Sequence, residues 1–215
     1  MDEHIDIYDA NLRHLGTMER LQAHMEGKWH VTFHCWVVTA IDGGKILFQL
    51  RSKNMANFPD LLDVTAAGHL EAGERVADGI REVSEELGID LPPDSLHGLG
   101  YRVEVADQEN GQRNREYQAV FIAQVDLPLA EYAPQVEEVT GLLWLPLDAG
   151  IALFSDKAAS ATAHGIRYDS ATATWVPMKR TVEKLDFLPR IQQYYLTACI
   201  MADRLLKEEF PLSIS

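Results

Sequence analysis

The stretch at residues 66–89, AAGHLEAGERVADGIREVSEELGI, constrains the fold of this chain more than any other. Residues 74–88 carry the pattern of an amphipathic helix, which the sequence therefore predicts. At about 100° per residue, one face of this helix is apolar and the opposite face collects acids. The apolar face holds Val76, Ile80, Val83 and Leu87, and the acidic face holds Asp78, Glu82, Glu85 and Glu86. One side of the helix can therefore dock on a sheet, and the other presents carboxylate oxygens.

The acidic face has few cationic neighbours, because Arg75 and Arg81 are the only bases in the helix. Exposed like charges at these spacings cost only a few tenths of a kcal/mol per pair, so a solvated acidic surface is one interpretation. In a cleft of lower dielectric each pair costs roughly 3 kcal/mol and requires a hard cation such as Mg²⁺, which prefers oxygen ligands. Gly68 and Gly73 bracket the loop before the helix, where glycine lets the backbone turn sharply and approach an ion. The glycines favour the metal interpretation.

These residues resemble the Nudix box, whose pattern is G-x5-E-x7-R-E-U-x-E-E-x-G-U with U apolar. Gly68, Glu74 and residues 81–89 supply every defined residue type, but six residues instead of seven separate Glu74 from Arg81. On a continuous helix this deletion rotates Glu74 by about 100° relative to Arg81. We expect the loop or the first turn near Glu74 to absorb the change, so the role of Glu74 stays open.

The resemblance implies a fold, an activity and a set of site residues. Members of the family fold as an α/β/α sandwich with a mixed sheet, and most hydrolyse a diphosphate linked to another moiety with Mg²⁺ or Mn²⁺. By position, the metal ligands would be Glu82, Glu85, Glu86 and the carbonyl of Gly68. Glu82 would also be the base that activates water, and Arg81 would orient the catalytic carboxylates.

Outside the box, the sequence resembles the isopentenyl diphosphate isomerases, which belong to the same superfamily. Residues 14–36, Arg51 and residues 58–74 carry this resemblance. In the isomerases a catalytic cysteine precedes the glycine–histidine pair, whereas Ala67 precedes Gly68 and His69 here. Without the thiol, proton transfer loses one of its two participants, so we predict a diphosphate hydrolase. An isomerase-like enzyme and a non-catalytic diphosphate-binding module are the alternatives.

Further contacts follow from the same resemblance. Glu116 occupies the place of a metal-binding glutamate in the isomerase-like branch, and Glu137 and Glu138 are an alternative downstream source. Arg51 would contact phosphate, and His69 is predicted to contact the substrate.

Three histidines form a separate set of possible metal ligands. His24, His30 and His69 match isomerase metal ligands, although five residues separate the first two here and six there. Lone histidines are more often structural, so a second metal site at these residues stays open. Imidazole favours Zn²⁺ or Mn²⁺ over Mg²⁺, and we therefore expect Glu116 and the histidines to act independently.

The chain divides into a Nudix domain at residues 1–150, with an N-terminal arm at 1–27, and a helical extension at 151–215. Strands are predicted at 4–8, 30–40, 45–52, 96–105, 115–126 and 139–147, with an Asp-Gly-Gly hairpin turn after the second. A long amphipathic helix is predicted at 188–210, with Pro189 in its first turn. We expect the extension to cover the core or to form a homodimer contact through Leu188, Ile191, Tyr195, Cys199 and Leu205.

Composition excludes several kinds of partner. The formal net charge of -14 repels polyanions, so nucleic acid is not expected as the main partner. No apolar stretch approaches the roughly 18 residues of a membrane span, and we expect a soluble, cytoplasmic protein. Cys35 and Cys199 stand far apart, which predicts two buried, reduced thiols. The expected partner is a small-molecule diphosphate, whose identity the sequence does not reveal.

Overall fold

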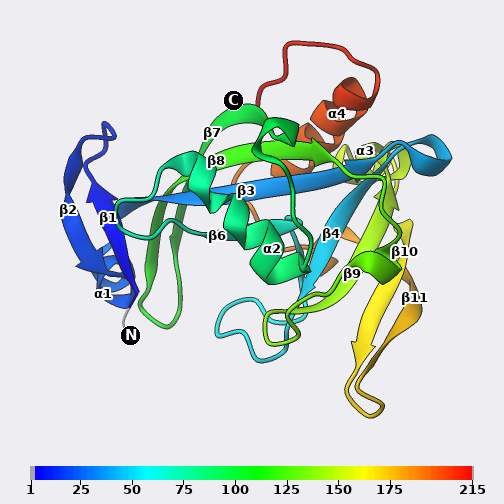
Figure 1. Cartoon of the computed structure of the whole chain (residues 1–215), viewed down its shortest axis with the longest axis horizontal. Coiled ribbons are helices and arrows are strands. Elements are labelled where there is room, and N and C mark those ends of the chain that lie inside the picture. Colours follow the sequence, from blue (N-terminus) through cyan, green and yellow to red (C-terminus); the bar gives the residue numbers. More distant parts are fainter. Residues whose placement is uncertain (1–2, 215) are drawn as a thin grey trace.

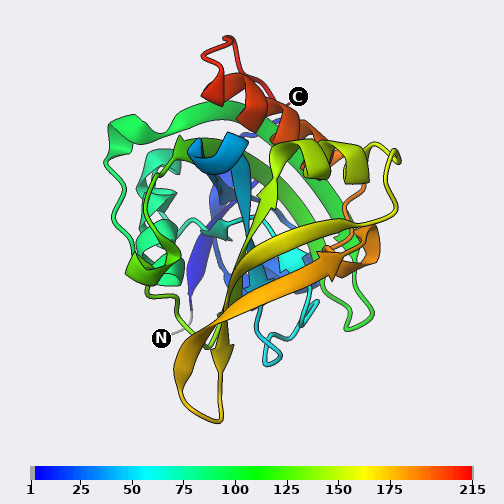
Figure 2. The ribbon, with the colours of Figure 1, turned by 90° about the vertical axis from the view of Figure 1, so that its right-hand side faces the viewer.

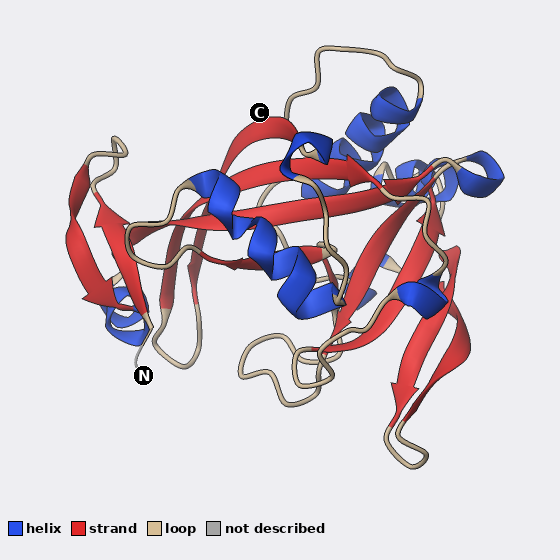
Figure 3. Cartoon of the chain, viewed as in Figure 1, coloured by secondary structure: helices blue, strands red, loops and turns tan. Residues whose placement is uncertain are grey.

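The computed structural model describes residues 3–214 as a mixed α/β structure (Figures 1 and 3). The α-helices in this range are α1 (Arg20–Glu26), α2 (Arg81–Leu87), α3 (Leu147–Phe154) and α4 (Tyr194–Leu206). The strands are β1 (His4–Tyr8), β2 (His14–Glu19), β3 (Trp29–Thr39), β4 (Lys45–Arg51), β5 (Leu62–Asp63), β6 (Ala66–His69), β7 (His97–Asp107), β8 (Arg113–Gln124), β9 (Val139–Pro146), β10 (Ala161–Asp169) and β11 (Thr174–Val182). All the strands that were predicted from the sequence are present.

Strand β3 is the branch point of the sheet. It pairs in parallel with β8 and antiparallel with β6, and its last residues Val38 and Thr39 pair with β4. From β4 the sheet continues through β9 to β10 and β11. The predicted hairpin therefore forms, but β3 and β4 diverge after two residue pairs into different arms of the sheet (Figure 1).

The side chains of β3 alternate between two apolar cores. Phe33, Cys35 and Val37 pack in the core on the side of α2. Trp36 and Val38 pack in the core that contains α3 and α4. In Figure 2, α2 and α4 lie on either side of the strands between them. This order of helix, sheet and helix, with parallel and antiparallel pairs, confirms the predicted α/β/α sandwich.

The predicted acidic helix is present, but it consists of a 3₁₀ helix followed by an α-helix. Val76–Ile80 form the 3₁₀ helix η2, and α2 begins at Arg81 and ends before the left-handed Gly88. Arg75, which precedes η2, has extended backbone angles, so Glu74 lies outside the helix and helical rotation does not set its position relative to Arg81. The short spacing is absorbed in the loop before the helix, as expected.

The C-terminal extension is helical only in part. Strands β10 and β11 form a hairpin that prolongs the sheet beside β9. The prediction of a helical segment at 151–215 misses this hairpin. Few side chains of the hairpin are buried, so its sequence lacks the apolar alternation of a core strand.

The predicted C-terminal helix is shorter than expected, because α4 begins at Tyr194. The prediction that Pro189 lies in its first turn is wrong. The chain before α4 runs along β5, where the Leu188 N–H donates to the Leu62 carbonyl at 2.9 Å. Ile191 is consequently 62% exposed, contrary to expectation. The extension does cover the core, through Leu188, Tyr195, Cys199 and Leu205, which are all buried.

Both cysteines, Cys35 and Cys199, are free and buried, as predicted. Burial raises the pKa of each thiol to about 12, so both are protonated at neutral pH. The helices within residues 3–214 are too short or too polar to cross a bilayer.

Candidate active site

One cleft of about 880 Å³ brings the predicted site residues together. Its lining includes Arg51, Gly68, His69, Arg81, Glu82, Glu85, Glu86 and Glu116. These residues come from β4, β6, α2 and β8. Nine carboxylates and four guanidinium groups line the cleft, so its field favours cations.

Glu82 and Glu86 are the buried acids of α2, with 9% and 6% of their surface exposed. Glu86 Oε2 accepts a hydrogen bond from the Ala67 N–H at 3.0 Å. The Glu82 carboxylate lies against Gly68, where an added Cβ would stand 2.0 Å from Glu82 Cδ. Only glycine leaves room for this carboxylate. Burial raises the pKa of Glu82 to about 7 and that of Glu86 well above its ordinary value.

Arg81 holds this corner of the cleft together. Its guanidinium donates to Glu74 at 2.8 and 3.0 Å, to Glu82 at 2.7 Å and to Glu85 at 3.0 Å. It also donates to the His69 carbonyl at 3.0 Å. Glu74 therefore keeps its contact with Arg81 despite the short spacing. Glu85, whose side chain is 54% exposed, lies at the rim. The orienting role predicted for Arg81 agrees with this geometry.

The carboxylates of α2 fit a divalent cation. The charge of Glu138 raises the pKa of both Glu82 and Glu86, so three acids act on one another. Among residues 3–214, Arg81 is the only cationic side chain that bonds to either buried acid. Acids buried with so little neutralising charge are either protonated or bound to a cation, and their all-oxygen donor set suits Mg²⁺ or Mn²⁺.

Glu116 lies with the histidines. The parallel register of β3 and β8 places Glu116 opposite His30. Burial lowers the pKa of His24 and of His30, and the charge of Glu116 offsets part of this lowering. Glu138, by contrast, acts on the acids of α2 and lines the cleft. The expected grouping of Glu116 with the helix carboxylates therefore has no support in this arrangement, and Glu138 is the better placed downstream acid. The reason is the register, which a local sequence pattern does not reveal.

The three histidines form a second group of metal-ligand atoms. One nitrogen each of His24, His30 and His69 lies within 4.8 Å of the others. His30 Nδ1 donates to the Lys28 carbonyl at 2.9 Å, and its Nε2 is buried without a partner in the described chain. Burial lowers the pKa of all three, that of His24 to about 4. The rings are therefore neutral, the form that binds metals. This donor set suits Zn²⁺ or Mn²⁺ better than Mg²⁺.

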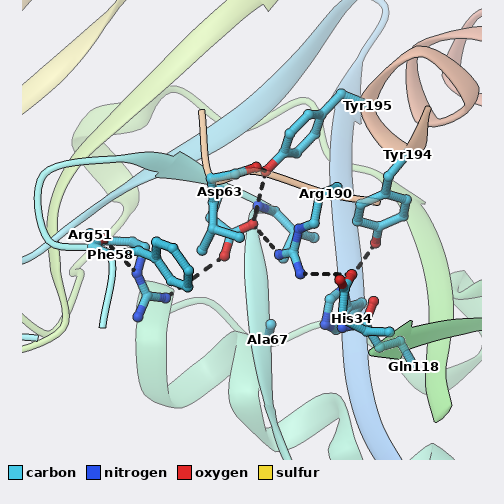
Figure 4. Close-up of polar contacts among 12 residues, drawn as sticks. His34, Arg51, Phe58, Asp63, Ala67, Gln118, Arg190, Tyr194 and Tyr195 are labelled. Atoms are coloured by element: carbon cyan, nitrogen blue, oxygen red, sulfur yellow. Dashed lines mark hydrogen bonds and ion pairs between the residues drawn. The ribbon is translucent and has the colours of Figure 1, made fainter. Parts of the chain in front are cut away.

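Arg51 lines the cleft but is engaged by the loop that follows β4 (Figure 4). Its Nε donates to the Phe58 carbonyl at 3.2 Å, and its Nη2 donates to the Asn57 carbonyl at 3.0 Å. Its Nη1 lies 3.7 Å from Asp63 Oδ2. A phosphate at Arg51 would share the guanidinium with these contacts.

The sequence did not predict the other polar residues of the cleft. His34 of β3, Asp63 of β5, Gln118 of β8 and Arg190 of the extension also line it (Figure 4). A signal existed for two of them, because His34 interrupts the apolar run VTFHCWVV and Gln118 interrupts EYQAVFIA. No local pattern marks Asp63 or Arg190, which lie 127 residues apart.

Comparison with known proteins identifies the family and supports the fold. Residues 28–164 match the NUDIX domain family. The chain is 32% identical over 198 residues to an uncharacterised Nudix hydrolase of Clostridium acetobutylicum, an alignment that covers 90% of this chain and 94% of that protein. It is 30% identical over 147 residues to an isopentenyl-diphosphate Δ-isomerase of Aliivibrio fischeri, covering 67% of this chain and 80% of that one. The chain therefore belongs to the Nudix family. Within that family it is classed with the hydrolases, as predicted.

A solved structure from Deinococcus radiodurans supports the fold. It matches with a TM-score of 0.56 over 72% of this chain and 90% of that chain. The sequences are 19% identical, so the similarity concerns the fold alone.

Proposed function

We propose that the protein hydrolyses the diphosphate bond of a nucleoside diphosphate-linked or related organic diphosphate, with Mg²⁺ or Mn²⁺ as cofactor. The observation that carries this proposal is the pair Glu82 and Glu86, buried one helical turn apart beside β6. A diphosphate cannot approach these acids unless cations neutralise them. The cleft, at about 880 Å³, has room for a substrate of this size.

The positions of these residues indicate the role of each one in hydrolysis. Glu82, Glu86 and the Gly68 carbonyl would hold the cation, with Glu85 and Glu138 at the rim. When bound, the cation supplies positive charge to the phosphate oxygens and to the attacking water. Glu82 accepts the proton of that water as the general base. A P–O bond to water forms while the bond to the bridging oxygen breaks, and the leaving phosphate keeps that electron pair.

An isomerase-like reaction is the second candidate, because His24, His30 and His69 lie together beside Glu116, and two of them, His24 and His69, line the cleft. Ala67, which lines the cleft, argues against it, since the isomerases carry a cysteine at this place. Neither Cys35 nor Cys199 lines the cleft, so within residues 3–214 no thiol replaces it. Hydrolysis is therefore favoured.

The test is a panel of nucleoside diphosphate sugars, dinucleotides, nucleoside triphosphates and isoprenoid diphosphates, each with Mg²⁺ or Mn²⁺. Phosphate is measured after phosphatase treatment. Glu82→Gln and Glu86→Gln should each lower kcat by about 100-fold or more, and EDTA should abolish turnover. Ser84→Ala, at an exposed position of the same helix, is the control and should leave kcat unchanged.

Two outcomes would contradict the proposal. Wild-type turnover by both glutamine variants on a confirmed substrate would show that the site is wrong. If the wild-type protein hydrolyses nothing but binds a diphosphate by calorimetry, it is a non-catalytic binding module.

A further inference from the structure

Two residues that line the cleft, Asp63 and Arg190, belong to a group of buried charges (Figure 4). Asp63, 4% exposed, accepts a hydrogen bond from Arg190 Nη2, and the Arg190 side chain is 9% exposed. Arg102 and Glu104 of β7 form a second buried ion pair, and Glu104 Oε2 lies 3.6 Å from Arg190 Nη1. Arg190 Nε is buried and has no partner within residues 3–214. One donor of this group is therefore unused.

Tyr194 connects these charges to His34. The Tyr194 hydroxyl accepts a hydrogen bond from Trp36 Nε1 at 3.1 Å and lies 2.9 Å from His34 Nδ1. The hydroxyl can donate to His34 Nδ1 or accept from it, since its oxygen has two acceptor lone pairs, so both neutral tautomers of His34 fit this contact. Burial lowers the pKa of His34 to about 3, so the ring is neutral. His34 lines the cleft, and Nε2 of its neutral ring can donate or accept one hydrogen bond, depending on the tautomer.

Charges buried this deeply need a reason beyond stability. A buried ion pair can often be replaced by apolar residues of similar size without loss of stability, because desolvation offsets the attraction. A buried donor without an acceptor is rare in native structures. Arg190 combines both features at the wall of the substrate cleft, where a ligand can supply the missing acceptor.

We infer that Asp63, Arg190 and His34 form a subsite that binds the non-phosphate part of the substrate through hydrogen bonds and so selects nucleoside or sugar diphosphates over hydrocarbon diphosphates. This inference rests on the proposed function, because it places the diphosphate at α2. Asp63 neutralises Arg190, so the complementary group is polar and uncharged, with acceptors such as a carbonyl, a hydroxyl or a ring nitrogen. A hydrocarbon would strip water from both charges without replacing the hydrogen bonds.

The C-terminal extension supplies the selective residue. Arg190 lies beyond residues 28–164, the part of the chain that matches the family. The hydrogen bond from the Leu188 N–H to the Leu62 carbonyl fixes this segment beside Asp63. The Nudix domain alone therefore lacks the guanidinium that completes the subsite.

The first test compares kcat/KM for ADP-ribose and UDP-glucose with kcat/KM for geranyl diphosphate. The wild-type enzyme should favour one or both polar substrates by about 100-fold or more, because a subsite built for hydrogen bonds rejects a ligand that lacks them. In the double variant Asp63→Leu/Arg190→Met, which replaces the pair by apolar residues, this ratio should fall about 30-fold. Thermal unfolding shows whether the double variant is folded. If the double variant does not fold, the comparison uses Arg190→Lys, which keeps the positive charge but loses the planar fork of the guanidinium.

The matched control is an ion pair of the extension outside the cleft. Lys184 Nζ lies 2.6 Å from Asp156 Oδ1, and both side chains are largely exposed. Lys184→Met/Asp156→Asn should keep the wild-type substrate ratio. An unchanged ratio in the folded subsite variants, or efficient use of geranyl diphosphate by the wild-type enzyme, would show that the buried charges only fasten α4 to the sheet.

A binding measurement separates this inference from the proposed function. Calorimetry in EDTA with AMP, glucose 1-phosphate and geranyl monophosphate requires no catalysis. Tighter binding of AMP indicates that the subsite takes the nucleoside, and tighter binding of glucose 1-phosphate indicates the sugar. If the protein hydrolyses nothing but shows this preference and loses it in the double variant, the subsite stands and the hydrolase proposal fails. If the protein hydrolyses a diphosphate but binds the three monophosphates equally well, the hydrolase proposal stands and the subsite is wrong.

Discussion

Replacing Gly68 by alanine should remove activity while leaving the fold intact. The added Cβ would stand 2.0 Å from Glu82 Cδ and 2.1 and 2.2 Å from the two carboxylate oxygens. Ordinary contacts of this kind lie at about 3.4 Å or more, so the carboxylate must move by more than about 1 Å. It is the far end of a flexible side chain, which can move without disturbing the backbone. A displacement of about 1 Å in a catalytic group costs on the order of 100-fold in rate.

The assay is steady-state hydrolysis of a confirmed diphosphate substrate with Mg²⁺. Gly68→Ala should lower kcat by about 100-fold or more, with a melting temperature within a few degrees of the wild-type value. The matched control is Gly98→Ala, where the added Cβ would meet Phe121 Cε1 at an ordinary 3.7 Å. If Gly68→Ala folds and keeps kcat within about threefold of the wild-type value, Glu82 does not need the space that glycine provides, and its placement in the reaction is wrong.

Three further predictions concern protonation, the histidines and Ala67. Burial raises the pKa of Glu82 to about 7, so in EDTA its protonated form stabilises the fold below about pH 4.5, and this contribution is lost as pH rises through 7. The melting temperature of Glu82→Gln should therefore rise relative to that of the wild-type protein between pH 5 and pH 8. A difference in melting temperature that does not change with pH would contradict the raised pKa of Glu82. Crystals soaked in Zn²⁺ or Mn²⁺ should show an anomalous peak within about 2.3 Å of His24, His30 and His69, whereas a peak at α2 alone would leave these histidines structural. Isopentenyl diphosphate should yield no dimethylallyl product by NMR, and product at an enzymatic rate would mean that the isomerase thiol is dispensable.

Local patterns revealed the parts of the structure that depend on local contacts. The faces of residues 74–88 and the strands follow from the spacing of apolar and acidic residues within a few turns of chain. The corner of Gly68, Arg81, Glu82 and Glu86 follows from the resemblance to the Nudix box. The position of Glu116 opposite His30 could not be predicted in this way, because the parallel register of β3 and β8 decides which residues face one another. A register between strands that are distant in sequence is set by assembly of the whole sheet.

The inner part of the cleft shows the same limit more strongly. Asp63 and Arg190 meet only because the extension runs back along β5 before α4 begins. That extended run also explains why the helix starts at Tyr194 and why Ile191 is exposed. A tertiary contact overrode the helical pattern of residues 188–193, as it often does where propensity is weak.

The extended backbone at Arg75 means that the contact between Glu74 and Arg81 does not depend on helical phase. A chain with one residue more in this interval can place it in the loop before η2 without rotating α2. An added residue within residues 81–86 has a different effect. It would turn Glu86 by about 100° around the helix axis and away from the Ala67 amide.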